Sequence, residues 1–346
     1  MVQLVSGLVG DDEVAALFGD DVHLAALLSV ESALARAEAA CGLIAAEAAE
    51  RIVEVCRSLV LDRDSLHHGT VKDGVVIPDL VRQLRAAIGE PHAGAAHLGA
   101  TSQDILDTAL ALQLKALFDL IDRRLAHVLT LLDDWAAREG EVVLMAHTRL
   151  QRALPFTARD KLATWAEPLR RHRERLAATR RSALTVQIGG PVGTGDSFRG
   201  HAPAIIAAMA DELGLSAAPA WHAERDRIAD VGHLLAQIAG SLGKIGQDVG
   251  MMAQNEVGEI RLAGGGKSSA MAHKNNPVGA EVLVALARFS AGLQGTLLQA
   301  LVHESERSGA AWTLEWMVLP PLAETAGAAL RHGARLVDGA RFVPMA

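Results

Sequence analysis

An uninterrupted apolar stripe of unusual length occupies the middle of the chain. Residues 101–137 contain no Gly or Pro, and large apolar residues recur every three or four positions from Leu106 to Trp135. The stretch opens with Thr-Ser-Gln-Asp, a run of residue types that cap helix N-termini. At 1.5 Å per residue it predicts one helix about 55 Å long, which indicates a bundle of long helices.

The rest of the chain also favours an all-α fold. Helical patterns predict further helices at residues 11–40, 44–58, 76–88, 155–184, 221–262, 277–301 and from 320 towards the C-terminus. Six glycines lie between Gly232 and Gly258, and each costs about 1 kcal/mol inside a helix, so they predict close approach by neighbouring backbones, with broken helices as the alternative. Residues 187–200, rich in Gly, predict a loop. We expect an N-terminal helical domain, residues 1–99, and a long-helix domain, residues 100–346.

Composition and charge narrow the classes of function. Aromatic residues make up 3% of the chain and Tyr is absent, which suits closely packed helices better than sheets. The formal net charge of -8 has the wrong sign for binding nucleic acid. The sequence shows neither a secretion signal nor a run of about 18 apolar residues, so we expect a cytoplasmic protein with no membrane span. Cys41 and Cys56 lack metal-ligand spacing and are expected to be reduced, structural thiols.

The segment from Gly264 to Pro277, GGGKSSAMAHKNNP, carries the densest set of reactive side chains. It places hydroxyls, a lysine, a histidine and carboxamides just before a predicted helix, whose N-terminus favours a carboxylate. A phosphate-binding loop of the form GxxxxGK[ST] is excluded, because its first glycine falls at Arg261 and no strand precedes it. The segment is expected to be a lid that carries proton donors and acceptors.

This segment resembles the hallmark loop of the fumarase and aspartase superfamily, GSSxMPxKxNP. The residues that match it in order are Ser268, Ser269, Met271, Lys274, Asn276 and Pro277, while Lys267 replaces the Gly and Ala272 the first Pro. The resemblance implies an all-α long-helix bundle, assembled as a homotetramer around a central helical bundle, and no cofactor. It implies that Ser269 is the catalytic base, with Ser268 and Lys274 beside it. It also implies substrate contacts from Met271, His273 and Asn276.

Two further segments resemble the same superfamily. HLGATSQDILDTAL, residues 97–110, is similar to the substrate-binding TSxD region, although its Thr-to-Asp run alone would be a helix cap. It implies substrate contacts from His97, Thr101, Ser102 and Gln103. HTRLQRALPFT, residues 147–157, is similar to RTHLQPAxPxT and implies contacts from Thr148, Arg149 and Gln151. Arg149 stands where most members have a His that assists catalysis, which puts a His-dependent lyase mechanism in doubt.

Three longer stretches point to one branch of the superfamily. Residues 7–44, 221–239 and 303–320 resemble the 3-carboxymuconate cycloisomerases of bacterial protocatechuate degradation, the β-ketoadipate pathway. Many of those relatives extend further at the C-terminus. The resemblance implies lactonisation of 3-carboxy-cis,cis-muconate, a small tricarboxylate. The developing negative charge would need fixed cations, for which Lys274, Arg149 and either Arg225 or Arg307 are the candidates.

Other functions stay open at this point. A site for 3-sulfomuconate would look the same, because a sulfonate is similar in charge and size to the third carboxylate. An adenylosuccinate or argininosuccinate lyase would share the Ser269 loop. A non-catalytic protein on the same scaffold, like the lens crystallins, is disfavoured because the loop keeps its serines, Lys274 and Asn276. No metal is expected, because the His67–His68 pair, His92 and His97 lack the HExxH spacing.

The predicted helix lengths have a consequence for the site. A straight helix over residues 101–137 would hold Thr101 and Thr148 about 55 Å apart, too far for one small substrate. The segment after His222 separates it from Ser269 in the same way. Different subunits must then contribute these groups, which predicts a symmetric homotetramer with D2 symmetry and active sites shared between subunits.

Overall fold

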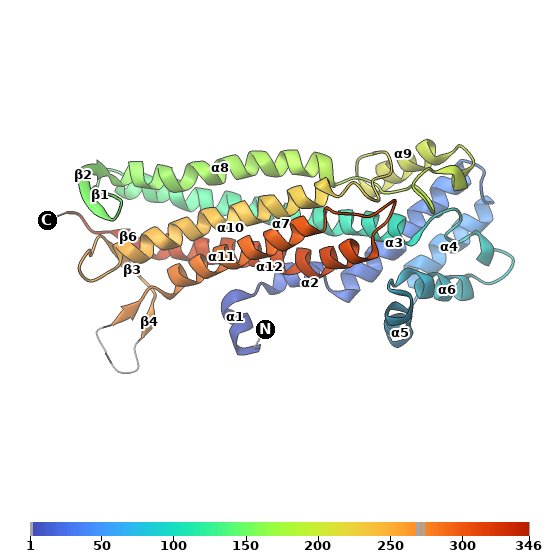
Figure 1. Cartoon of the computed structure of the whole chain (residues 1–346), viewed down its shortest axis with the longest axis horizontal. Helices are drawn as coiled ribbons and strands as arrows, with labels where there is room; N and C mark the ends of the chain where they lie inside the picture. The colour runs from blue at the N-terminus through green and yellow to red at the C-terminus, as the bar shows by residue number, and fades with distance from the viewer. Residues whose placement is uncertain (1–2, 268–270, 272–273, 346) are drawn as a thin grey trace.

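The protein is an elongated bundle of long helices. The computed structural model describes residues 3–267, 271 and 274–345. Figure 1 shows long helices running side by side along most of the molecule, with shorter helices gathered at one end. The strands of the described part form three separate two-stranded sheets. The all-α expectation is therefore confirmed.

The helices and strands follow in this order. The N-terminal helices are α1 (Gln3–Val9), α2 (Asp12–Leu17), α3 (Asp20–Ala40), α4 (Ala46–Ser58), α5 (Arg63–Asp73) and α6 (Ile77–Ile88). The later helices are α7 (Ser102–Glu139), α8 (Ala158–Ala183), α9 (Ala202–Leu213), α10 (Asp226–Met252), α11 (Val278–Gln299) and α12 (Gly309–Gly339). The strands are β1 (Val143–Thr148), β2 (Gln151–Thr157), β3 (Ile260–Leu262), β4 (Gly266–Lys267), β5 (Asn275–Asn276) and β6 (Ala340–Phe342).

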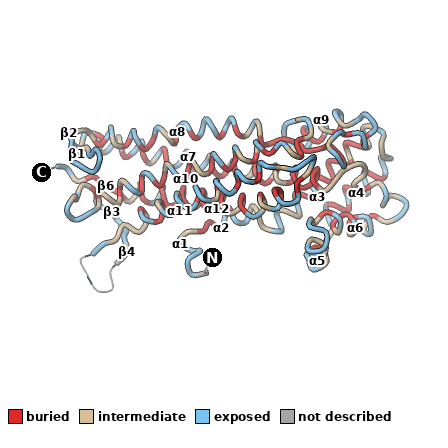
Figure 2. The backbone as a smooth tube through the Cα atoms, viewed as in Figure 1, coloured by how far each residue is buried: buried red, intermediate tan, exposed pale blue. Residues whose placement is uncertain are grey.

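Helix α7 is continuous, as its sequence predicts. It has 38 residues, so it is about 57 Å long. Thr101 is its N-cap, and the backbone N–H of Thr101 donates to the Asp104 side chain at 3.0 Å. Its apolar stripe packs into the main core, where Leu114, Phe118 and Trp135 are inaccessible to solvent. Figure 2 shows this burial following the inner faces of the long helices along the whole bundle.

Several predicted helix boundaries were wrong. The segment 11–40 is broken at Gly19, where the chain turns between α2 and α3. Helix α10 ends at Met252, ten residues before the predicted end, and the chain then turns, with a left-handed φ of 62° at Gly258. Helix α12 begins at Gly309, well before Pro320, because the Ser308 side chain accepts from the backbone of the first turn at 3.1 Å. Helix α5 and the β1–β2 hairpin were not predicted.

The glycines of α10 divide by the face they occupy. A Cβ on Gly243 would lie 2.3 Å from the Cβ of Ala287, and one on Gly246 would lie 2.6 Å from the carbonyl oxygen of Ala280, both on α11. The close approach of backbones is therefore confirmed for these two, whereas Gly232 is crowded only by side-chain atoms of Leu297, Gln294 and Leu322. Gly240 and Gly250 face open space, so close approach does not explain them.

The N-terminal helices share their core with the start of α7. Helix α3 packs against α4, α7 and α9. A second cluster of buried apolar residues joins Leu27 and Leu34 of α3 to Ile105 of α7 and Met209 of α9. The division of the chain near residue 99 stays a prediction.

Helix α11 is the most apolar of the long helices. Among the described helices it alone is long and apolar enough to span a membrane by length and composition. One such helix does not indicate a membrane protein, because core helices pass the same test. It packs along α10 and α12 but leaves Phe289 and Leu298 exposed, at 51% and 44%. These two side chains flank the buried stripe of α11 on opposite sides, and neither is covered within the described part of the chain.

We expect Gly246→Ala to destabilise the protein by about 1–3 kcal/mol, because the added methyl group would press on the α11 backbone. Gly240→Ala, on the open face of the same helix, should instead be neutral or stabilise by up to about 1 kcal/mol through helix propensity. Urea unfolding of both variants measures the difference. Equal effects would contradict close α10–α11 packing.

Candidate active site

The carboxylate of Asp104 organises the start of α7. It is inaccessible to solvent, and it accepts hydrogen bonds from the backbone N–H groups of Gly189 and Gly190, both at 2.9 Å. It also accepts from the Thr101 N–H, and it lies 2.8 Å from Nε2 of the buried His222. One side chain therefore fixes the first turn of α7, the glycine-rich loop and the segment before α10 relative to one another.

Gln103 links this first turn to an arginine. Its Nε2 donates to Asp107 at 3.1 Å and to the carbonyl oxygen of His222 at 2.8 Å. Its Oε1 accepts from Nε of Arg307 at 2.9 Å, and Nη2 of Arg307 donates to the Pro191 carbonyl at 3.2 Å. Because the amide of Gln103 is committed to these contacts and fully buried, we revise its expected role from substrate binding to positioning Arg307.

Arg225 lies in a buried ion cluster. It is 2% exposed, and its guanidinium donates to Asp107 at 2.7 and 3.1 Å and to Glu315 at 2.9 and 2.5 Å. Burial opposes ionisation of Glu315, but the hydrogen bond from Arg225 more than compensates, and the pKa of Glu315 lies below its usual value. We therefore revise the expectation that Arg225 binds substrate, because the N–H groups on two edges of its guanidinium already donate to protein carboxylates. Arg307, only an alternative from sequence, is the arginine beside the start of α7.

His97 is held from behind by a buried acid. Its Nδ1 lies 2.7 Å from Oε1 of Glu31, which is 1% exposed. Burial alone would lower the pKa of the His97 imidazole, but the charge and hydrogen bond of Glu31 raise it above the usual value. A second buried acid on α3, Glu38, has its pKa raised to about 8 by burial and by the charge of Glu31, so it is neutral at pH 7. Sequence reasoning missed Glu31, for which no motif gave a signal.

Backbone strain gathers in the segments that the motifs single out. In the described part of the chain, the residues other than Gly with positive φ are His97, Arg149, Leu150, Arg199 and Ser305. Each of these lies in a motif, in the glycine-rich loop or in the segment that carries Arg307. Such conformations cost about 1–3 kcal/mol each and persist where the surrounding structure imposes them, which is common at functional sites.

The motif of residues 147–157 includes the tip of the β1–β2 hairpin. Thr148 pairs with Gln151 across the two-residue turn, and all four residues of the turn are exposed. Arg149 and Leu150 take φ values of 50° and 66°, as the tightest hairpin turns require. The hairpin lies at the end of the bundle away from α4–α6 (Figure 1). Arg149 is therefore presented outward from this protomer.

The described residues of the Gly264–Pro277 motif include the paired strands β4 and β5. Asn276 pairs with Gly266 across the two strands, and Lys274 and Met271 are exposed. Helix α11 follows at once with Pro277 as its N-cap, as predicted. The predicted positions Ser268, Ser269 and His273 lie outside the described residues.

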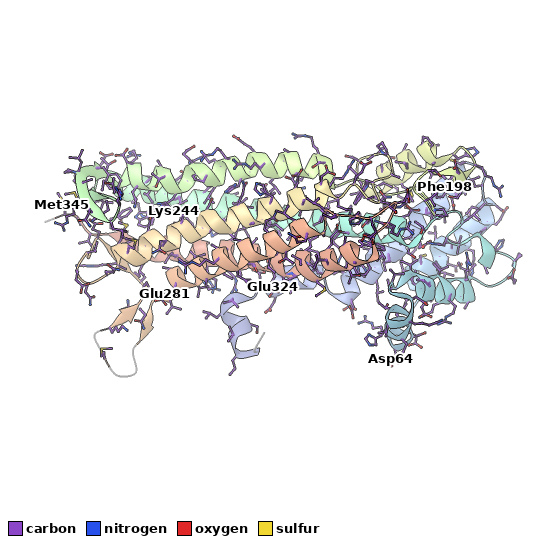
Figure 3. All side chains as sticks on the ribbon, in the orientation of Figure 1. Asp64, Phe198, Lys244, Glu281, Glu324 and Met345 are labelled. Atoms are coloured by element: carbon purple, nitrogen blue, oxygen red, sulfur yellow. The ribbon has the colours of Figure 1, made fainter. Side chains whose placement is uncertain are left out.

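The structure brings Arg307 to the motif of residues 97–110. The motifs of residues 147–157 and 264–277 lie elsewhere in the chain's fold. In Figure 3, the labelled residues Phe198 and Met345 lie near opposite ends of the bundle. Phe198 lies beside Gly99 close to the start of α7, whereas Met345 donates its N–H to the Val143 carbonyl beside the hairpin. Within one protomer, His97, Thr101 and Ser102 are therefore separated from Thr148 and Lys274 by about the length of α7.

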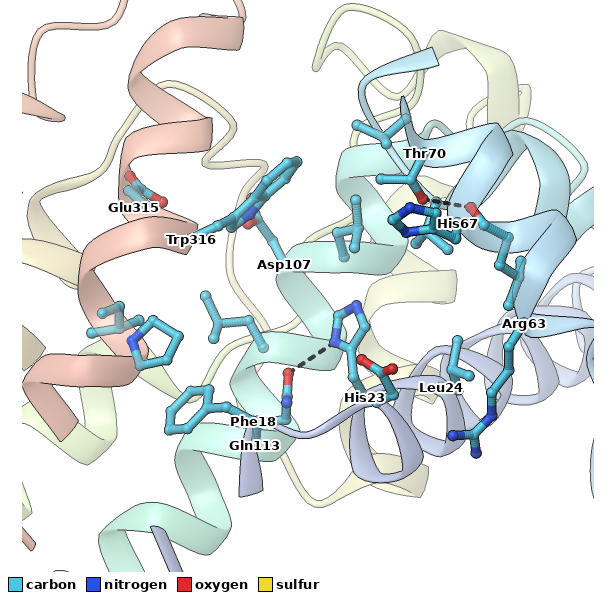
Figure 4. A pocket seen from close by; sticks show the side chains of 18 residues that line it. Phe18, His23, Leu24, Arg63, His67, Thr70, Asp107, Gln113, Glu315 and Trp316 are labelled. Atoms are coloured by element: carbon cyan, nitrogen blue, oxygen red, sulfur yellow. Dashed lines mark hydrogen bonds between the residues drawn. The ribbon is translucent and has the colours of Figure 1, made fainter. Parts of the chain in front are cut away.

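A cavity of about 420 Å³ lies further along α7, between α3, α5 and α12. Its walls are largely apolar, with Phe18, Leu24 and Trp316, and its polar groups include His23, which contacts Gln113 at 3.2 Å (Figure 4). The carboxylates of Asp20, Asp107 and Glu315 also line it. Because none of the predicted site residues lines this cavity, we place the candidate site at His97 and Arg307. The described residues include no cluster of three His, Cys, Asp or Glu side chains that could hold a metal.

Comparison with known proteins gives consistent matches. A lyase family model matches residues 9–290. The chain is 40% identical to the 3-carboxy-cis,cis-muconate cycloisomerase of Pseudomonas aeruginosa, over 94% of this chain and 72% of that enzyme. It is 34% identical to the Acinetobacter baylyi enzyme of the same name, over 98% and 77%. The 3-carboxy-cis,cis-muconate lactonizing enzyme of Pseudomonas putida superposes with a TM-score of 0.91 at 36% identity, covering 99% of this chain and 77% of that structure.

We expect Arg225→Met to lower the free energy of unfolding by about 3–5 kcal/mol, because Asp107 and Glu315 would stay buried without a counter-charge. The matched control is Arg173→Met, whose ion pair with Asp122 is more than 40% exposed on both sides and should contribute at most about 1 kcal/mol. Urea denaturation of the two variants at pH 7 provides the comparison, and a small effect for both would refute the role given to the cluster.

Proposed function

As a member of this lyase family, of the fumarase and aspartase type, the chain is an enzyme, and we propose that it lactonises 3-carboxy-cis,cis-muconate to a carboxymuconolactone. The observation that carries this proposal is similarity along almost the whole chain, at 34–40% identity, to enzymes named for that reaction. The matched region includes all three motifs. Arg149, in place of the family histidine, further favours a cycloisomerase over a lyase of the adenylosuccinate type.

The reaction demands a strongly cationic site. One carboxylate oxygen of the substrate adds to a double bond, and a proton is delivered to the neighbouring carbon, so a C–O and a C–H bond form while one C=C π bond is consumed. The intermediate carries extra negative charge beside a carboxylate on a molecule that already holds three. Fixed cations and oriented N–H donors in a site closed from water stabilise such charge, each by about 3–4 kcal/mol.

The proposed site combines groups from both ends of the bundle. His97, Thr101, Ser102 and Arg307 form one half, at the N-terminus of α7, where backbone N–H groups favour a carboxylate. Thr148, Arg149 and Gln151 on the hairpin form part of the other half. We propose that Ser269 exchanges the proton with the substrate carbon, assisted by Ser268 and Lys274, and that Met271, His273 and Asn276 line the site. These roles rest on the resemblance of the loop.

We further propose that the enzyme is a homotetramer whose sites are shared between subunits. The two halves of the site are too far apart within one protomer to bind one small tricarboxylate. The exposed tip of the hairpin and the exposed apolar side chains of α11, Phe289 and Leu298, supply surfaces for contact between copies of the chain. We place the protein in the cytoplasm, because Cys41 and Cys56 are both free thiols.

The activity is tested with purified protein by following loss of the diene absorbance of 3-carboxymuconate and of 3-sulfomuconate and, separately, release of fumarate from adenylosuccinate. We expect turnover of 3-carboxymuconate without any added cofactor, and a fall of at least about 100-fold in Ser269→Ala. Turnover of adenylosuccinate alone would overturn the assignment, and preference for 3-sulfomuconate would redefine the substrate.

Site sharing is tested by mixing inactive variants. After subunit exchange, Thr101→Ala and Thr148→Ala should together recover up to about a quarter of the wild-type activity, because random assembly in a symmetric oligomer pairs an intact α7 start with an intact hairpin in that share of sites. The control mixture is Thr148→Ala with Arg149→Ala. Both of these defects lie in the same hairpin, so every site keeps one of them and no recovery is expected. Recovery in neither mixture would contradict shared sites.

A further inference from the structure

A buried carboxyl group lies directly behind one of the proposed substrate ligands. Glu31, on α3, is 1% exposed, and its Oε1 lies 2.7 Å from Nδ1 of His97. Its other oxygen, Oε2, has no hydrogen-bond partner in the described part of the chain. A carboxylate removed from water and so sparsely hydrogen bonded is costly unless a cation neutralises it, and His97 is the group in contact with it.

His97 is placed so that its second ring nitrogen remains available. Its side chain is 13% exposed, and Nδ1 is taken by Glu31, while the described residues provide no hydrogen bond to Nε2. The backbone at His97 is left-handed, with φ 61°, a conformation that the fold retains despite its cost. His97 lies four residues before Thr101, in the half-site that Arg307 completes.

The charges around the pair identify Glu31 as the acid that holds it. On α3 itself, Glu38 is neutral at pH 7, because its pKa is raised to about 8. From α4, Cys56 faces Glu31 as a neutral thiol, since burial raises its pKa to about 11. From α7, Asp104 favours protonation of His97, and from α6, Arg85 opposes it. From α9, Glu212 is paired with Arg36 of α3.

We propose that Glu31 is a positioning residue of the active site, which orients His97 through Nδ1 and keeps its ring protonated, so that the Nε2–H donates to a carboxylate of the substrate. The inference rests on the proposed function and extends it. The motif that indicates His97 contains no acid in this position, and Glu31 lies 66 residues earlier in the chain. The ring then acts as a fixed cation at the α7 end of the site.

The test uses the isosteric variant Glu31→Gln. Titration of the His97 ring is followed by NMR on protein labelled with ¹³C-histidine, and the resonance is assigned by its loss in His97→Gln. We expect the His97 pKa to fall in Glu31→Gln, because the variant loses the carboxylate charge that favours the protonated ring. This measurement needs no substrate, so it decides the pairing even if the proposed activity fails.

Kinetics then test the link to the substrate. Because the ring must be charged to bind a carboxylate, kcat/KM should decline as pH rises through the His97 pKa, and in Glu31→Gln this decline should move to lower pH. At pH 7 we expect kcat/KM to fall about 10–100-fold, mainly through KM, since the contact exists in both ground and transition states. An unchanged pH profile in Glu31→Gln would overturn the proposal.

Two further variants separate positioning from general damage to the fold. Glu38→Gln changes an equally buried acid on the same helix, which is already neutral and does not contact His97, and it should leave the His97 titration and the kinetics at pH 7 unchanged. In the double variant Glu31→Gln/His97→Gln, the loss should not exceed that of His97→Gln alone. Additive losses would show that Glu31 acts independently of His97. If Glu31→Gln does not fold, the KM and pH profile of His97→Gln still test the cationic contact.

Discussion

The buried carboxylate of Asp104 is the interaction on which the candidate site depends. It satisfies three backbone N–H groups and one imidazole nitrogen, drawn from the first turn of α7, the glycine-rich loop and the segment before α10. A buried charge is stable only when its hydrogen-bonding capacity is met, so these segments adopt one relative position. Gln103 and Arg307 are held by this arrangement, because Gln103 donates to the His222 carbonyl and accepts from Arg307, which also donates to Pro191 in the glycine-rich loop.

The length of α7 is the second constraint. A helix without a break gives the bundle its rigidity, but it holds one set of substrate-binding groups far from the other. In the function proposed above, the side chains of a single protomer therefore supply half a site at either end. The strained hairpin tip at Arg149 is consistent with this arrangement, because it presents a cation outward from the end of the bundle instead of into the protomer's own core.

The sequence predicted most of the scaffold and less of the site. Helix α7 was predictable because no breaker interrupts its stripe, whereas the end of α10 was placed too late, because no Pro marks it and the polar residues Gln254, Asn255 and Glu256 were taken as part of the helix. The motifs indicated His97 and the residues at the tip of the hairpin, but not the hairpin itself. The choice between Arg225 and Arg307 could not be made from sequence, because it depends on Asp107 and Glu315, which packing brings to Arg225 from two other helices. Glu31 could not be predicted either, because only packing brings it to His97.

The cluster around Arg225 also has a consequence for biosynthesis. Its two carboxylate partners come from α7 and α12, and Glu315 lies 90 residues after the arginine. A chain emerging from the ribosome therefore exposes Asp107 and Arg225 long before the last acid is made. Asp107 and Arg225 balance each other's charge, but the Nε–H of Arg225 has no acceptor until α12 brings Glu315, so the central helices complete their buried polar contacts only when the final segment of the chain has been translated and has docked.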